Sequence, residues 1–190
     1  MDEERMTRGM VLSGIDGFIG KRYDEATARR LRDGYSDELK TALRDVKIAA
    51  WYPRAFFIEL NRAVASAAGS DAAYNDLLTA GRSIAEIATN TFMKLLLRML
   101  TPRMFAKKFP DFWKRDNKGG YIHVDSAGLD DDRVVFYLRD VEGFDHIGPI
   151  AAGYISFALS AITGKEVGIK LTGWSVEKPA ASELRYDVSW

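Results

Sequence analysis

The sequence predicts a single α+β domain: a helical N-terminal part, residues 1–118, packs on a four-stranded antiparallel sheet, residues 119–190, in β-β-α-β-β order. Two observations predict this fold. Apolar residues recur at helical spacing up to Lys118, and after Gly119 and Gly120 they alternate with a period of two. The chain has 190 residues, of which 47% are apolar and 28% charged, which suits one domain with one core.

The first fifty residues predict short peripheral elements. Residues 24–32 and 36–44 have amphipathic helical patterns, and Ser36 is a good N-cap for the second. Residues 10–20 mix apolar residues with glycines, each of which costs a helix about 1 kcal/mol relative to alanine. We therefore expect a strand or a short helix over residues 10–20.

Longer helices are expected in the middle of the chain, and everything before Lys118 is expected to be helical or loop. Proline suits a first helical turn, so Pro53, after Trp51 and Tyr52, and Pro102, after Thr101, mark two helix starts. Gly69 suits the position directly after a helix end, and Gly81 is expected to interrupt the next helix. The helices predicted from these signals cover residues 53–68, 71–80 and 83–100, and a further one begins at residue 102.

The last third predicts two hairpins around one helix. Residues 121–125 and 133–139 alternate on either side of a turn rich in Gly and Asp, residues 128–132. A helix over residues 146–162 is apolar nearly all round and should be buried on more than one side. Two more alternating strands, from Val167 and from Leu184, complete a sheet with one face on the helices and one in solvent.

Composition excludes several functional classes. Lys plus Arg and Asp plus Glu number 27 each, so no overall charge favours nucleic acid, and no nucleic-acid partner is expected. There is no cysteine, which removes disulfides and thiolate chemistry and fits a cytoplasmic protein. No secretory signal and no apolar stretch long enough to span a membrane is expected.

Catalytic and metal-binding patterns are not visible. The two histidines, His123 and His146, have no spacing typical of ligands, so zinc is disfavoured. No serine lies in a nucleophile motif, and the prediction leans against an enzyme. The polar groups that an enzymatic hypothesis would test first are Arg98, Arg103 and His123.

One segment is unusually basic. Residues 94–118 carry eight Lys and Arg against Asp111 and Asp116, with aromatic residues between them, whereas residues 125–145 carry seven acidic residues. The basic segment is either a surface for an anionic partner or a solvated face that pairs with the acidic hairpin. The helical spacing of Phe105, Phe109 and Phe112 favours the second alternative.

The motifs Trp51-Tyr52-Pro53 and Phe109-Pro110-x-Phe112-Trp113, with the terminal hairpins, are similar to a myxobacterial family of uncharacterised proteins of about this length. More distantly, the order of elements resembles vinyl-reductase-type small-molecule-binding domains and the heme nitric-oxide-binding fold. This resemblance implies a helical part capping a sheet, an apolar ligand pocket between them and a tendency to form dimers. It implies no catalytic residue.

The resemblance also has departures. Heme-binding relatives require a helical axial histidine and a Y-x-S-x-R motif, and Tyr154-Ile155-Ser156 does not continue to the arginine, so heme is disfavoured. Vinyl-reductase-type domains often carry cysteines in the final hairpin, where this chain has Trp174, Ser175 and Glu177. The cofactor, if one exists, is unknown from the sequence.

Two functional hypotheses remain. The first is a non-catalytic, ligand-binding sensory domain that encloses a small apolar molecule. Its candidate ligand-binding residues are the large apolar side chains Phe92, Phe105, Phe136, Tyr154 and Phe157. The second is a protein–protein interaction or dimerisation adaptor without a small-molecule ligand, using Trp51, Tyr52 and Trp190 or the last strand as a sheet edge.

Overall fold

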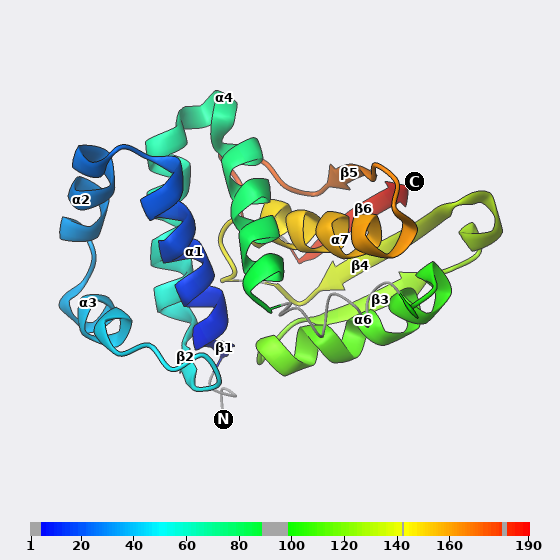
Figure 1. Ribbon diagram of the computed structural model, residues 1–190, viewed down its shortest axis with the longest axis horizontal. Coiled ribbons are helices and arrows are strands. Elements are labelled where there is room, and N and C mark those ends of the chain that lie inside the picture. Colours follow the sequence, from blue (N-terminus) through cyan, green and yellow to red (C-terminus); the bar gives the residue numbers. More distant parts are fainter. Residues whose placement is uncertain (1–4, 89–98, 142, 180–181) are drawn as a thin grey trace.

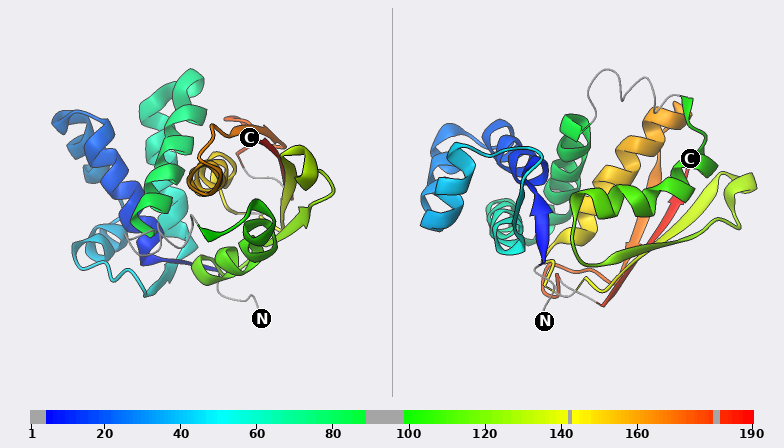
Figure 2. Two further views of the ribbon diagram at one scale, coloured as in Figure 1. Left: turned by 45° about the vertical axis from the view of Figure 1, so that its right-hand side comes forward. Right: turned by 90° about the horizontal axis from the view of Figure 1, so that it is seen from below.

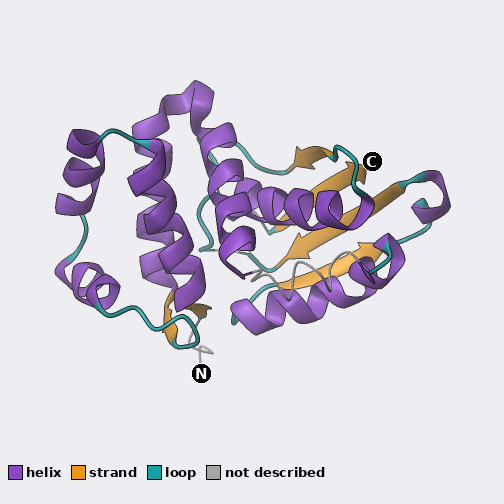
Figure 3. Cartoon of the chain, viewed as in Figure 1, coloured by secondary structure: helices purple, strands orange, loops and turns teal. Residues whose placement is uncertain are grey.

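The structure is a computed structural model that describes residues 5–88, 99–141, 143–179 and 182–190. It confirms the predicted α+β class, with helices gathered on one face of an antiparallel sheet (Figure 1). Figure 3 shows the order of the layers: α7 (Ile147–Thr163) lies between the sheet and the long helix α4 (Arg54–Ala88), and the N-terminal helices lie beyond α4. Buried side chains from all these layers form one continuous hydrophobic cluster.

The N-terminal part contains α1 (Gly9–Arg22), α2 (Glu25–Asp33) and α3 (Asp37–Arg44). The Ser36 side chain caps α3, as predicted, by accepting a hydrogen bond from the Leu39 amide at 3.3 Å. Of the two alternatives expected for residues 10–20, the helix is confirmed and the strand is wrong, and the helix extends beyond these residues at both ends. A Cβ at Gly14 would lie 2.7 Å from Cγ1 of Ile84, so the glycine lets α1 approach α4.

Two short strands interrupt the helical part, which the sequence did not predict. β1 (Met6–Arg8) pairs antiparallel with β2 (Trp51–Pro53). The predicted helix start at Pro53 is therefore one residue early, since Trp51–Pro53 are extended and α4 begins at Arg54. The cause is tertiary: pairing with a strand more than forty residues away overrides the local signal.

Helix α4 (Arg54–Ala88) is a helical hairpin. Its two arms meet at Gly69, whose φ of 74° lies in the left-handed region, as the predicted helix end requires. The predicted interruption at Gly81 is wrong, because the second arm continues through it. Gly81 faces α7 (Ile147–Thr163), where a Cβ would overlap the carbonyl oxygen of Ile150.

Helix α6 (Pro102–Asp116) begins as predicted, with the Thr101 side chain accepting from the Met104 amide at 3.2 Å. Its apolar side is buried through Phe105, Phe109 and Trp113, which confirms the predicted helical stripe. Figure 2 shows α6 and α7 against the same face of the sheet.

The sheet contains β3 (Tyr121–Asp125), β4 (Arg133–Arg139), β5 (Gly168–Thr172) and β6 (Glu183–Ser189). All pairings are antiparallel, in the order β3-β4-β6-β5. The alternation predicted the buried face correctly, with Leu184 and Tyr186 fully buried. The proposal that the last strand is a sheet edge is wrong, because β6 pairs with β4 on one side and β5 on the other.

The other face of the sheet is polar. Its strands present residues such as His123, Arg139 and Lys170, and no helix in the described part of the chain covers them. Between β3 and β4 the turn holds a short 3-10 helix, Leu129–Asp131, and Arg103 of α6 pairs with Asp130 there at 2.9 Å. That contact is one ion pair between the basic segment and the acidic hairpin. Among the described helices, none is long and apolar enough to cross a membrane.

Candidate functional site

A small apolar cavity lies where the helical part meets the sheet-forming part. Its volume is about 50 Å³. The helical side is formed by Val11 of α1 and by Phe57 and Ile84 of α4. The opposite side comes from the C-terminal half of α6 and the first two turns of α7, and consists of Phe109, Phe112, Trp113, Asp116, Asn117, Ile147, Ile150, Ala151 and Tyr154.

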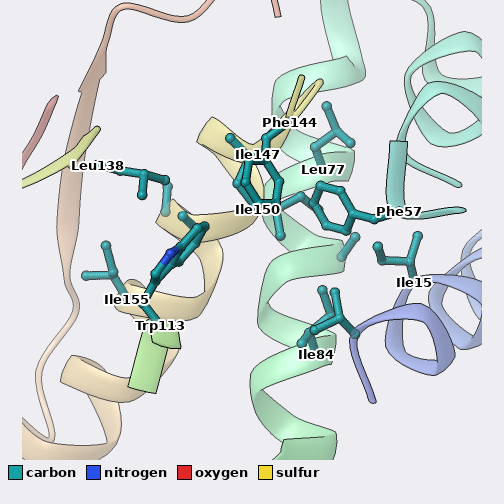
Figure 4. Packing of buried hydrophobic residues seen from close by; sticks show 14 of the residues in the cluster. Ile15, Phe57, Leu77, Ile84, Trp113, Leu138, Phe144, Ile147, Ile150 and Ile155 are labelled. Carbon is teal, nitrogen blue, oxygen red and sulfur yellow. The ribbon is translucent and has the colours of Figure 1, made fainter. Parts of the chain in front are cut away.

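Aromatic contacts fix the cavity wall. Figure 4 shows the Phe57 ring directed toward Ile147 and Ile150 of α7, with Trp113 on the opposite side of these two residues. Phe57 and Trp113 both pack edge-on against Phe144, with ring centroids 5.9 and 5.8 Å away. Such contacts fix ring orientation as well as burying area. The packing of the hydrophobic core therefore fixes the orientation of the aromatic rings in the cavity wall.

The orientation of Trp113 is also fixed by hydrogen bonds. Its indole N–H donates to the carbonyl oxygens of Gly119 and Gly120, each at 3.2 Å. These glycines have φ values of 94° and 69°, so the chain turns there in a way that other residues rarely adopt. The turn that joins α6 to β3 thus places the largest side chain of the wall.

One end of the cavity is polar. Asp116 is buried and its carboxylate accepts from the Arg115 guanidinium at 2.8 and 2.6 Å. Arg115 also donates to the Tyr154 hydroxyl at 3.4 Å. The Asn117 side chain accepts from the Thr7 hydroxyl at 3.3 Å. The polar groups are thus held by protein partners.

Burial and neighbouring charges determine the pKa values of Tyr154 and Arg115 at the polar end of the cavity. The pKa of the Tyr154 phenol is raised, mainly because burial disfavours the phenolate, although Arg115 opposes the shift. The pKa of Arg115 is raised by its hydrogen bonds to Asp116. A neutral phenol and a charge-compensated ion pair suit binding of a neutral molecule.

The cavity does not contain a catalytic arrangement among the described residues. Its titratable lining residues are Asp116, held by Arg115, and Tyr154, kept neutral by burial. No histidine lines it, and nothing pairs a nucleophile with a base. In the described part of the chain, no group of three or more His, Cys, Asp or Glu side chains is arranged so that it could bind a metal ion.

The structure places the predicted ligand-binding residues unequally. Tyr154 lines the cavity. Phe105 and Phe136 are fully buried one layer behind it, and both contact Phe109, a lining residue, with centroids 5.3 and 5.0 Å apart. Phe157 is partly buried and does not line the cavity, and Phe92 lies outside the described residues.

Sequence reasoning missed most of the lining. Val11, Phe57 and Ile84 come from segments far apart in the sequence, and no local pattern brings them together. Trp113 and Phe112 did carry a signal, because they belong to the Phe109-Pro110-x-Phe112-Trp113 motif.

The two histidines lie in different environments, neither in the cavity. His123 is exposed on the solvent face of the sheet beside Tyr137, with ring centroids 5.9 Å apart. His146 is buried at the start of α7, with a φ of 62°, and its ring centroid is 6.2 Å from that of Trp174. Arg103 is exposed in its pair with Asp130, and Arg98 lies outside the described residues.

Comparisons with known proteins identify the fold. No protein-family model matches the sequence, and no curated protein matches it. Among solved structures, the chain is similar to the H-NOX protein from K. algicida in its unliganded Fe(II) state. The TM-score is 0.71 at 10% identity, over 96% of this chain and 95% of that one. An H-NOX protein from S. oneidensis in the Fe(II)NO state gives 0.66 at 8% identity, over 96% and 98% of the two chains. The chain therefore has the H-NOX fold, as the resemblance to the heme nitric-oxide-binding fold implied.

Proposed function

We propose that this chain is a non-catalytic, small-molecule-binding sensory domain whose ligand occupies the cavity between α1, α4, α6 and α7. The observation that carries the proposal is the position of the cavity. It is apolar over most of its wall, and it joins the two parts of the fold. A molecule bound there contacts both parts at once, so binding can change how they pack.

The size and chemistry of the cavity define the class of ligand. A volume of about 50 Å³ is well below the roughly 300–1,000 Å³ of sites for drug-sized ligands. The ligand is a neutral, mostly apolar molecule of a few heavy atoms. A polar end, if it has one, faces Tyr154 and Asn117.

Because the chain has the H-NOX fold, we asked whether the cavity could hold heme. The described residues do not form a suitable heme site. An apolar cavity of roughly 150 Å³ holds a benzene molecule, and a porphyrin is far larger than benzene. The space here is about 50 Å³, and Trp113, Phe57 and Phe109 form its walls. The chain has no cysteine, and its two histidines, the usual axial ligands, lie outside the cavity. We therefore propose that ligand binding here is independent of heme.

A hemin titration tests the heme-independent part of this proposal. Purified protein mixed with hemin is expected to give the absorption spectrum of free hemin, without a shifted Soret band. A stoichiometric shifted band would contradict it. In that case His146→Asn and His123→Gln would show which histidine supplies the ligand.

A second experiment tests the ligand site. Native mass spectrometry of protein purified from its own host is expected to show a small bound molecule that is lost on denaturation. The Ala151→Val variant places two extra methyl groups at the cavity wall and should abolish the adduct. Gly17→Ala is the control, because nothing lies within 4 Å of a Cβ there. A bare protein mass in the wild type, or an adduct kept by Ala151→Val, would argue against the site.

A further inference from the structure

Apart from the cavity, the core contains a group of buried polar atoms that have no hydrogen-bond partners. It lies on the side of α7 that faces β5 and β6. Three atoms belong to it: Nδ1 of His146, Nε1 of Trp174 and the hydroxyl oxygen of Tyr186. None has a partner among the residues that the structure describes. Leaving a buried donor or acceptor unpaired costs about 1–3 kcal/mol, and more than roughly 90% of such groups in proteins are paired.

These side chains are neighbours although they come from the N-cap of α7, the loop after β5, and β6. The ring of Trp174 lies 6.2 Å from that of His146 and 5.7 Å from that of Tyr74. Leu171, the strand partner of Tyr186, and Trp174 both lie within 3.2 Å of a Cβ placed on Gly148, in the first turn of α7.

All three atoms are buried, although the Trp174 side chain as a whole is only partly buried, and this restricts which molecules can pair with them. Tyr186 is fully buried and His146 is 6% exposed. Burial raises the pKa of Tyr186 and lowers that of His146, so both are neutral near pH 7. A charged ligand would enter without a compensating charge among these three groups, so a neutral one is favoured.

The hydrogen-bonding capacities of the three atoms then indicate which chemical group can pair with them. The Trp174 indole can only donate, the Tyr186 hydroxyl donates or accepts, and a neutral imidazole nitrogen does one or the other. A hydroxyl group both donates and accepts, and so can pair with all three. We propose that this part of the core binds a neutral hydroxyl-bearing molecule, either water or a small organic alcohol, through His146, Trp174 and Tyr186.

The segment after β5 closes this site. The His146 amide donates to the Pro179 carbonyl at 3.3 Å, and the Lys178 amide donates to the Ser175 hydroxyl at 3.0 Å. These contacts fold residues 173–179 across the start of α7. The site is separate from the cavity of the proposed function, since none of its three residues lines that cavity.

A crystal structure of the full chain tests the proposal. Electron density is expected within hydrogen-bond distance of at least two of the three atoms. A single peak indicates water, and extended density, matched by a small-molecule mass in native mass spectrometry, indicates an organic alcohol. Absence of density, with the three atoms unpaired or paired with protein groups, would overturn the proposal.

A solution measurement gives an independent readout. Tyr186→Phe removes one hydrogen-bonding partner of the bound molecule and should speed hydrogen exchange of the Trp174 indole by about threefold to tenfold. Tyr35→Phe is the matched control, because Tyr35 also has a buried hydroxyl without a partner but belongs to a different part of the core. Equal exchange rates in both variants and the wild type would count against the proposal.

Discussion

At the scale of single residues, the buried histidine is the group most sensitive to its surroundings. The pKa of His146 is lowered from its usual 6.5, first because burial disfavours the charged imidazolium. The neighbouring Arg62 acts in the same direction, and Asp145 opposes it. Its backbone is also unusual, since φ is 62° in a residue that is not glycine.

This shift predicts a pH dependence of stability. Because the folded-state pKa is below the unfolded value of 6.5, the unfolded chain takes up the proton first. Stability is therefore complete above about pH 7 and falls as the pH drops below 6.5. Urea unfolding measured between about pH 7 and pH 5.5 should show this slope in the wild type.

Two variants separate His146 from other titrating groups. His146→Asn should flatten the slope, and asparagine tolerates the left-handed backbone that this position requires. His123→Gln is the matched control, because it removes a histidine from the exposed face of the sheet. A slope that survives His146→Asn would show that another group carries it.

For single residues, the sequence predicts burial better than it predicts which side chains line the cavity. Tyr154 was identified from its large apolar ring in the helix between the hairpins, and it lines the cavity. Phe105 and Phe136 were chosen for the same reason, but they lie one layer away. Size and apolar character predict burial, whereas facing a cavity depends on which distant segments meet.

At the scale of elements, the crossing of α4 and α7 controls the position of the cavity walls. At Gly81 and Gly153 the helices approach so closely that a Cβ would overlap a carbonyl oxygen of the other helix, that of Ile150 or of Leu78. Next to the crossing, Arg82 donates to the Ser156 hydroxyl at 2.8 Å. Ile84 and Ile150, which line the cavity, stand close to these glycines in sequence.

A glycine-to-alanine pair tests the crossing. Gly153→Ala should lower the free energy of unfolding by about 2–3 kcal/mol, because the helices must separate to admit the methyl group. Gly17→Ala, also within a helix but with nothing within 4 Å, should raise it by about 0.5–1 kcal/mol. Denaturant unfolding measures both, and similar effects of the two substitutions would mean that the crossing is not close.

Elements differ in how well the sequence predicts them. Strong alternation gave the bounds of β3 and β4 correctly, and the apolar run up to Gly164 gave α7 to within one residue. The sequence left helix and strand open at α1, and it failed at Gly81 and at Trp51, where a contact with a distant element decides the local structure. It also left the strand order open, because alternation assigns faces but does not identify neighbours.

At the scale of the whole molecule, the chain combines the H-NOX fold with an interior that its own side chains largely fill. Phe57 and Trp113 both pack against Phe144 where the two parts of the fold meet. The remaining space suits a very small apolar molecule. We propose that this space binds such a molecule without heme.

Xenon is the most direct probe of that claim, because it is apolar, compact and visible by its anomalous scattering. Crystals of the full chain pressurised with xenon should show one atom between Ile84, Phe109 and Ile150. The Ala151→Val crystal should show none there. Absence of xenon from this cavity in the wild type, or equal occupancy in the variant, would contradict the account.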